Sequence, residues 1–120
     1  MGDLSTHFSR HEFACKCGCG CNSVDYETLC VLEQVREYFG ASVSISSAHR
    51  CASHNASIGG ASNSQHLYGR ACDIAVYAVS PQLVADYVEN VPLKGRGGVG
   101  RYITFTHVDT RSDGPARWTG

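Results

Sequence analysis

The ten residues SQHLYGRACD, at positions 64–73, hold a histidine and, seven residues later, an aspartate. An imidazole nitrogen and a carboxylate oxygen are both good zinc ligands. A catalytic zinc takes three protein ligands and leaves a fourth position open for water. The third ligand that we predict is His107, in the segment YITFTHVD at positions 102–109. The sequence therefore predicts a scaffold that brings His66, Asp73 and His107 together around one metal ion.

The complete pattern is more specific than this pair of residues. The string Ser-x-His-x-x-Gly-x-Ala-x-Asp, followed downstream by a strand with His-x-Asp, resembles the zinc D-Ala-D-Ala carboxypeptidase family. That family includes bacterial cell-wall endopeptidases and phage endolysins, and it shares its fold with lysostaphin-type peptidases and the hedgehog signalling domain. The likeness runs from Leu4 to Trp118 and is greatest to a small branch in which phage and prophage proteins predominate. It implies a small α+β domain with a central antiparallel sheet and helices packed on one side.

The resemblance also implies substrate-binding residues. In the family a strand ends in a Ser-x-x-Arg element whose arginine faces the substrate, and Arg50 occupies that place. We predict that Arg50 grips a carboxylate or carbonyl of a peptide, because a planar guanidinium can do so with two parallel hydrogen bonds. A structural arginine paired with a loop carbonyl is the alternative. Ser64 and Gln65, directly before His66, are the other predicted substrate-binding residues.

The general base is where the sequence departs from better-known relatives. These place a Glu or Asp three residues before the last zinc histidine, or use a His-x-His pair, whereas this chain has Thr104 and His107-Val108-Asp109. Side chains two apart on a strand point to the same face, so His107 and Asp109 are both expected at the site. We predict His107 as the ligand and Asp109 as general base or as the residue that orients the ligand. The swapped roles are the alternative, and His49 is the reserve candidate for the base.

Length and composition are those of one compact α+β domain over residues 1–120, with 42% hydrophobic residues and 13 glycines. The net charge is −1, from 10 basic and 11 acidic residues, which offers no electrostatic attraction for nucleic acid or an anionic membrane. No apolar run approaches the roughly 18 residues of a membrane span, so no membrane insertion is expected. A secretory signal is not visible either. We therefore expect synthesis in the cytoplasm and delivery to the cell wall by phage lysis or in a virion.

Seven cysteines are present, and an odd number cannot pair completely within one chain. Four of them lie in CKCGCGC at positions 15–21, in the segment 1–22 that is expected to pack on the domain. Their one-residue spacing differs from the two-to-four-residue spacing of ordinary zinc knuckles. We favour bonded cysteines or buried free thiols over a second zinc site. A disulfide from this segment to Cys30 or Cys51 is one alternative.

Apolar periodicity and turn residues predict the main elements. A short turn at 9–12 is anchored by Phe8 and Phe13, and an amphipathic helix follows from Asp25 to Phe39 with Gly40 just past its end. The remaining predictions are a strand at 43–47, a strand at 71–76, a helix from Ser80-Pro81 to Pro92, a flexible turn at 95–100 and a last strand at 101–109.

Together these features favour a monomeric zinc metallopeptidase, of D,D- or L,D-type, that cleaves a peptide bond in bacterial peptidoglycan stems or crosslinks. A phage or prophage endolysin is the expected origin. Two alternatives remain open at this point. One is a non-catalytic zinc-stabilised binding domain, as the hedgehog resemblance allows, and the other is a cysteine-rich structural piece of a virion.

Overall fold

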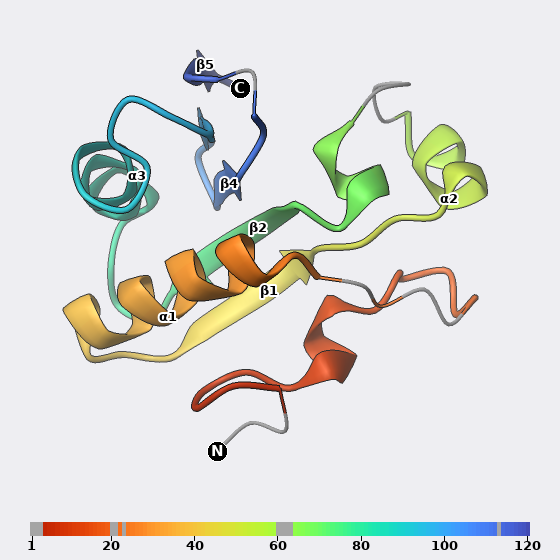
Figure 1. Cartoon of the computed structure of the whole chain (residues 1–120), viewed down its shortest axis with the longest axis horizontal. Helices are drawn as coiled ribbons and strands as arrows, with labels where there is room; N and C mark the ends of the chain where they lie inside the picture. The colour runs from red at the N-terminus through yellow and green to blue at the C-terminus, as the bar shows by residue number, and fades with distance from the viewer. Residues whose placement is uncertain (1–3, 20–21, 23, 60–63, 113) are drawn as a thin grey trace.

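Five strands form one sheet with the order β1-β2-β4-β3-β5 (Figure 1). The structure is a computed structural model that describes residues 4–19, 22, 24–59, 64–112 and 114–120. The strands are β1 (Val43–Ser47), β2 (Ala71–Val76), β3 (Gly98–Arg101), β4 (Thr106–Asp109) and β5 (Ala116–Thr119). Neighbours from β1 to β3 in this order are antiparallel, whereas β5 lies parallel to β3. The predicted α+β class is confirmed, and the parallel edge strand is an addition to it.

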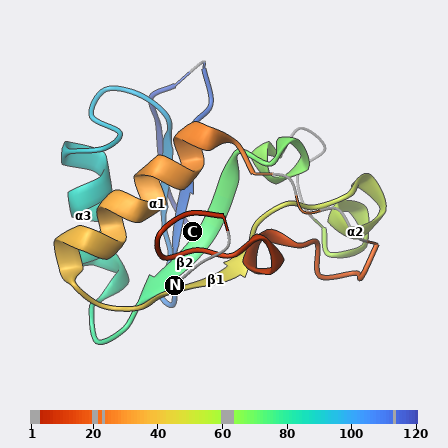
Figure 2. The same cartoon turned by 60° about the horizontal axis from the view of Figure 1, so that its bottom comes forward.

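Both long helices, α1 (Tyr26–Phe39) and α3 (Pro81–Asn90), pack on one face of the sheet (Figures 1 and 2). Alternate residues of the strands join them in a single core, which includes Ile74, Val99 and Val108. Because successive side chains on a strand point to opposite faces, the residues between these core positions face away from the helices. Asp73 and His107 are two of them. The helix-covered face therefore stabilises the fold and leaves the opposite face for a site.

Helix ends follow the predicted signals with one exception. Gly40 ends α1 in the left-handed conformation, with φ of 61°, and its amide donates to the carbonyl of Arg36. Ser80 caps α3 by accepting a hydrogen bond from the amide of Leu83, and Pro81 occupies the first turn. Asp25 precedes α1 but makes no capping hydrogen bond with its side chain. Its carboxylate accepts from the hydroxyl of Thr110 instead.

The N-terminal segment is anchored on this domain through aromatic and polar contacts. Its short 3₁₀ helix η1 (Arg10–Phe13) buries Phe13 completely, and Phe8 is 1% exposed. Glu33 of α1 accepts hydrogen bonds from the hydroxyl of Ser5 and the amide of His7. Local periodicity alone places Glu33 on the polar side of α1, because contacts with residues 26 and 28 positions earlier leave no trace in it.

The glycine-rich run is where the sequence prediction was wrong. Residues 95–100 were expected to form a flexible turn and residues 101–109 one strand, but 98–101 form β3, which turns back into β4. Strand β3 lies between β4 and β5 and is mostly buried. Its ladder contacts therefore determine its conformation, and glycine's weak local preference for a strand does not prevent it.

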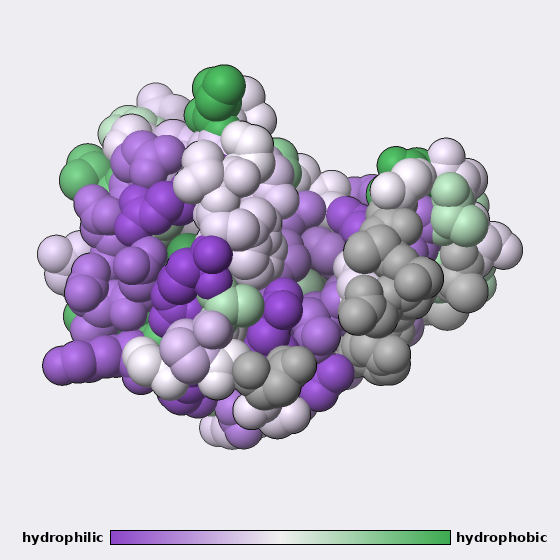
Figure 3. Space-filling model, turned by 90° about the horizontal axis from the view of Figure 1, so that it is seen from above, coloured by the Kyte–Doolittle hydropathy of each residue, from purple (hydrophilic) through white to green (hydrophobic). Residues whose placement is uncertain are grey.

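Exposed hydrophobic side chains lie in a groove between α1 and α3, lined by Tyr38, Leu83 and Val91, and singly elsewhere. The face seen from above is mainly hydrophilic, with hydrophobic residues in separate spots (Figure 3). The large exposed ones include Tyr26, Tyr77 and Ile103, which belong to different parts of the fold. Among the described residues, no helix combines the length and apolar character needed to cross a bilayer.

Candidate metal centre

Three separate elements bring the predicted ligands together. Asp73 of β2 and His107 of β4 are direct partners across two neighbouring strands. His66 comes from the 3₁₀ helix η2 (Gln65–Tyr68), which precedes β2 and is capped by Gly69 in the left-handed conformation. One donor atom from each of the three residues lies within 4.8 Å of the other two. All three residues are buried, with 2% to 8% of their surface exposed.

The orientation of His66 is determined by the backbone beside it. Its Nδ1 lies 2.7 Å from the carbonyl oxygen of Ala48. A carbonyl oxygen only accepts, so Nδ1 carries a proton, and in the neutral ring Nε2 then has the lone pair. That Nε2 lies 3.4 Å from Oδ1 of Asp73. Two electron-pair donors thus face each other in a buried place.

His107 lies between two carboxylates. Its Nδ1 is 3.0 Å from Oδ1 of Asp73, and its Nε2 is 2.7 Å from Oδ2 of Asp109. Burial alone would lower the pKa of His107, but the hydrogen bonds to Asp109 and Asp73 outweigh it, and the pKa is raised. Asp73 and Asp109 therefore both stabilise the positively charged form of the His107 ring.

Asp73 contacts both histidines and Arg50. Its Oδ1 faces both histidines, and its Oδ2 lies 3.7 Å from a guanidinium nitrogen of Arg50. Burial by itself raises the pKa of Asp73, whereas the neighbouring His107 and His66 side chains lower it, and the net result is a pKa well below the usual range. The carboxylate is ionised at neutral pH.

These residues fit a zinc ion. Two imidazole nitrogens and one carboxylate oxygen are a common donor set for catalytic zinc. The lone pair of His66 Nε2 opposite Asp73 Oδ1 needs a proton or a cation between the two atoms, because buried acceptors without a donor are costly. The carbonyl of Ala48 supplies the outer hydrogen bond that zinc-binding histidines normally make.

Asp109 contacts His107 from a buried position. It is 0% exposed and accepts three hydrogen bonds from Arg111, two of them from the guanidinium at 2.9 and 2.7 Å. Burial raises the pKa of Asp109, but Arg111 and His107 lower it more, so it is held well below its usual value. A Cβ atom at position 98 would clash with the carboxylate of Asp109, so a glycine fits beside it.

An open cavity of about 490 Å³ adjoins the three predicted ligands. Its described lining combines polar and aromatic residues: Arg50, Ser64, Gln65, His66, Asp73, Tyr102, Phe105, His107, Arg111 and Trp118. His49 and Asp109 are not among these residues. The backbone amide of His49 donates to the carbonyl of Phe13.

The predicted substrate-binding residues all line the cavity. Arg50 is held by Ser47 and Asn55, each 3.2 Å from one of its guanidinium nitrogens. The hydroxyl of Ser64 accepts from the amide of His66, which fixes the start of η2. Oε1 of Gln65 is buried and has no hydrogen-bond partner among the described residues. It is an acceptor available to a ligand.

The aromatic wall was not predicted. The rings of Tyr102 and Phe105 stack with centroids 4.3 Å apart, and the indole nitrogen of Trp118 donates to the hydroxyl of Tyr102 at 2.8 Å. The Trp118 ring lies 4.9 Å from that of His107. A signal existed at Gly100, the register partner of Trp118, where a Cβ would come within 2.6 Å of the indole. A glycine inside a strand often marks such a close approach.

The described residues combine an α+β fold with a His-Asp-His group that could hold a metal ion, which is the arrangement expected of a zinc metallopeptidase. Residues 6–109 match the family model described as Peptidase M15, and the chain therefore belongs to this family of zinc D-Ala-D-Ala carboxypeptidases. The matched region contains His66, Asp73, His107 and Asp109. The resemblance drawn from residues 64–73 is confirmed. Among curated proteins, none matches the chain.

Proposed function

We propose that this protein hydrolyses a peptide bond in bacterial peptidoglycan, in a stem peptide or a crosslink, with one catalytic zinc ion. The observation that carries the proposal is the group of His66, Asp73 and His107, whose donor atoms lie within 4.8 Å of one another beside an open cavity. Membership of the Peptidase M15 family supports the same activity.

His66, Asp73 and His107 are the residues that would hold the ion. When bound, zinc supplies Lewis acidity, which polarises a scissile carbonyl and makes a water nucleophile available near neutral pH. The chain contributes the fixed orientation of the three donors. Burial of all three and the contacts of Ala48 and Arg50 limit their movement.

Asp109 is proposed as a positioning residue. It accepts a hydrogen bond from Nε2 of His107 and thereby leaves Nδ1 turned toward Asp73. The guanidinium of Arg111 keeps Asp109 ionised and fixed. This arrangement supports the orienting role that was one of its two predicted roles. The assignment of a general base to Asp109 or His49 stays a prediction, since neither is among the described residues that line the cavity.

Substrate binding is proposed for Arg50, Ser64 and Gln65. Arg50 can offer guanidinium hydrogens to a peptide carboxylate or carbonyl, and it also pairs with Asp73, so it would connect substrate binding with the metal centre. Gln65 Oε1 is a buried acceptor suited to a peptide N–H. The rings of Tyr102, Phe105 and Trp118 line the same cavity and would give the substrate an apolar surface.

A phage or prophage endolysin, with D,D- or L,D-type specificity, is the biological setting that we propose. The support is the resemblance of the complete motif string to the phage-type branch of the family. The enzyme would reach the cell wall after lysis or delivery and act there as a monomer on the peptide part of the polymer.

Digestion of purified peptidoglycan tests the proposal. The zinc-loaded protein is expected to release muropeptides whose masses, measured by mass spectrometry, identify the bond cleaved. A chelator and the substitution His66→Ala should each abolish the release. Binding of peptidoglycan without any released fragment, by a protein of verified zinc content, would instead indicate the non-catalytic binding domain and overturn the enzyme assignment.

A further inference from the structure

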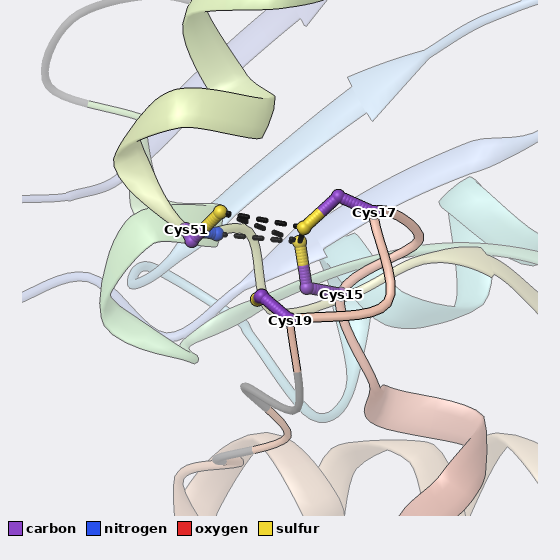
Figure 4. A group of neighbouring side chains, drawn as sticks. All are labelled: Cys15, Cys17, Cys19 and Cys51. Atoms are coloured by element: carbon purple, nitrogen blue, oxygen red, sulfur yellow. Dashed lines mark hydrogen bonds between the residues drawn. The ribbon is translucent and has the colours of Figure 1, made fainter.

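Four cysteine thiols gather at a second place in the molecule (Figure 4). Cys15, Cys17 and Cys19 come from the N-terminal segment, and Cys51 precedes α2 (Ala52–Ser57). The Sγ–Sγ distances are 3.5 Å for Cys15–Cys17, 3.6 Å for Cys17–Cys51 and 3.9 Å for Cys15–Cys51. All four sulfurs lie within 4.8 Å of one another.

These separations are those of a metal–thiolate centre. A zinc ion with four sulfur ligands at about 2.3 Å in a tetrahedron places the sulfurs about 3.8 Å apart. A disulfide requires an S–S distance of about 2.05 Å. The six cysteines in the described part of the chain are free thiols.

The backbone is folded to produce this convergence. Alternate residues of an extended strand lie roughly 6.6 Å apart, which would keep the thiols separate. A turn closed by the amide of Gly18 on the carbonyl of Cys15, with φ of 81° at Gly18, brings them together. Only a residue that tolerates positive φ fits there without strain. In the Cys-x-Cys-Gly-Cys pattern, the glycine therefore allows the turn that brings the thiols close to one another.

Backbone N–H groups also point at the sulfurs. The amide of Cys51 donates to Sγ of Cys15 at 3.4 Å, and the amide of His54 donates to Sγ of Cys51 at 3.5 Å. Such donors stabilise negative charge on sulfur, as they do around other metal-bound thiolates. A thiolate, not a thiol, is the form that binds metal.

We propose that Cys15, Cys17, Cys19 and Cys51 bind a second zinc ion, with a structural role. Four thiolates fill a tetrahedral coordination sphere and leave no position for water, which is the mark of a structural site. The ion would connect the N-terminal segment to the residue that follows Arg50 in the chain. Sequence spacing disfavoured this site, because the one-residue intervals between Cys15, Cys17 and Cys19 differ from those of ordinary zinc knuckles. The fourth ligand, Cys51, lies 32 positions beyond Cys19 and reaches the group only through the fold.

Metal content of a protein without the first site provides the test. The variant His66→Ala/His107→Ala, purified under reducing conditions and incubated with Zn²⁺ alone, is expected to retain one zinc per chain. Adding Cys17→Ser and Cys51→Ser should remove that zinc equivalent. Cys30→Ser, which alters a half-buried thiol of α1 outside the group, is the matched control and should retain it. With Co²⁺ in place of Zn²⁺, intense sulfur-to-cobalt charge-transfer absorption should appear only where the four thiols are intact.

The unmodified protein gives a second test that does not depend on the folding of variants. It should contain two zinc ions per chain, and zinc should protect Cys15, Cys17, Cys19 and Cys51 from alkylation while Cys30 reacts. Reaction of all four cysteines with the alkylating agent in the presence of zinc, or a native disulfide among them in peptide mapping, would overturn the proposal. These readouts are independent of peptidoglycan cleavage, so failure of the proposed enzymatic function would leave them unchanged.

Discussion

Asp73 lies between the two histidines and Arg50, because one of its oxygens faces both histidines and the other faces Arg50. The substitution Asp73→Asn preserves size and removes the negative charge. We expect loss of zinc from the His66 site and loss of peptidase activity, measured by metal analysis and muropeptide release. Asp86→Asn is the control, since Asp86 is exposed and its ion pair with Arg101 lies elsewhere. Retained activity in Asp73→Asn would exclude Asp73 as a ligand.

Substitution of Asp109 should weaken zinc binding without abolishing it. Asp109→Asn retains the shape of the side chain but removes the charge that holds His107 and Arg111. Loss of such an outer contact typically costs 10–100-fold in metal affinity or activity. We expect weaker zinc binding by roughly that factor, with recovery of the bound metal at high zinc concentration. Unaltered zinc affinity together with lost turnover would favour a general base over a positioning residue.

Gln65 provides a test of substrate binding apart from the metal. Gln65→Leu removes a buried acceptor that lacks a described partner, so the free energy of unfolding should not fall. Because the lost hydrogen bond to substrate would contribute about 0.5–1.5 kcal/mol, kcat/KM should drop about 2- to 12-fold. Zinc content should stay equal to that of the wild type. A lower free energy of unfolding with unchanged kcat/KM in Gln65→Leu would indicate a structural role for Gln65 and contradict substrate binding.

Among the secondary-structure elements, strand β3 leaves room for the aromatic wall because Gly100 has no side chain against Trp118. Gly100→Ala would place a methyl group 2.6 Å from the Trp118 indole. We expect a displaced indole and a cost of about 1–3 kcal/mol in the free energy of unfolding, as for other overpacked sites. Fluorescence reports this directly, since Trp118 is the sole tryptophan of the chain. Ile103→Ala, at a 90% exposed position beyond the same strand, should leave the emission unchanged.

The attachment of the N-terminal segment to α1 should depend on pH. Burial raises the pKa of Glu33, but the hydrogen bonds from Ser5 and His7 outweigh it, so the folded-state pKa is lowered. A lowered pKa means that the stabilisation is complete above the unfolded value, about 4.3. It is lost as the pH falls through the folded value. The difference in unfolding free energy between wild type and Glu33→Gln should therefore be larger at pH 7 than at pH 3.

Urea denaturation at the two pH values measures this difference. Glu37→Gln, one helical turn further along the exposed side of α1, is the matched control and should show little effect at either pH. A Glu33→Gln difference that stays constant between pH 7 and pH 3 would contradict the role given to its charge.

For the whole molecule, metal should contribute directly to stability. A ligand that binds only the folded state adds about 2.7 kcal/mol at a concentration 100 times its Kd. Chelation should therefore lower the Tm, and zinc should restore it. With two sites, His66→Ala/His107→Ala should keep part of the zinc-dependent rise in Tm. An equal Tm with and without zinc in that variant would argue against the thiol site.

The extent to which the sequence predicted this molecule differs between its regions. Helices α1 and α3 and strands β1 and β2 carry their own caps and apolar patterns, so their bounds were predicted closely. Strands β3 and β5 depend on pairing with each other, and short glycine-containing segments do not encode such pairing locally. The same applies to the site. His66 and Asp73 share one motif, whereas Trp118 and Cys51 approach their partners only through the tertiary fold.

The three predicted zinc ligands are attached to the fold in different ways. Asp73 and His107 belong to adjoining rungs of a hydrogen-bonded ladder, so they keep their mutual spacing when no ion is present. His66 sits on a single short turn, secured chiefly by Ala48 and by the amide of Arg50. Binding and release of the ion should then involve movement of His66 with η2, while Asp73 and His107 stay in place on their strands.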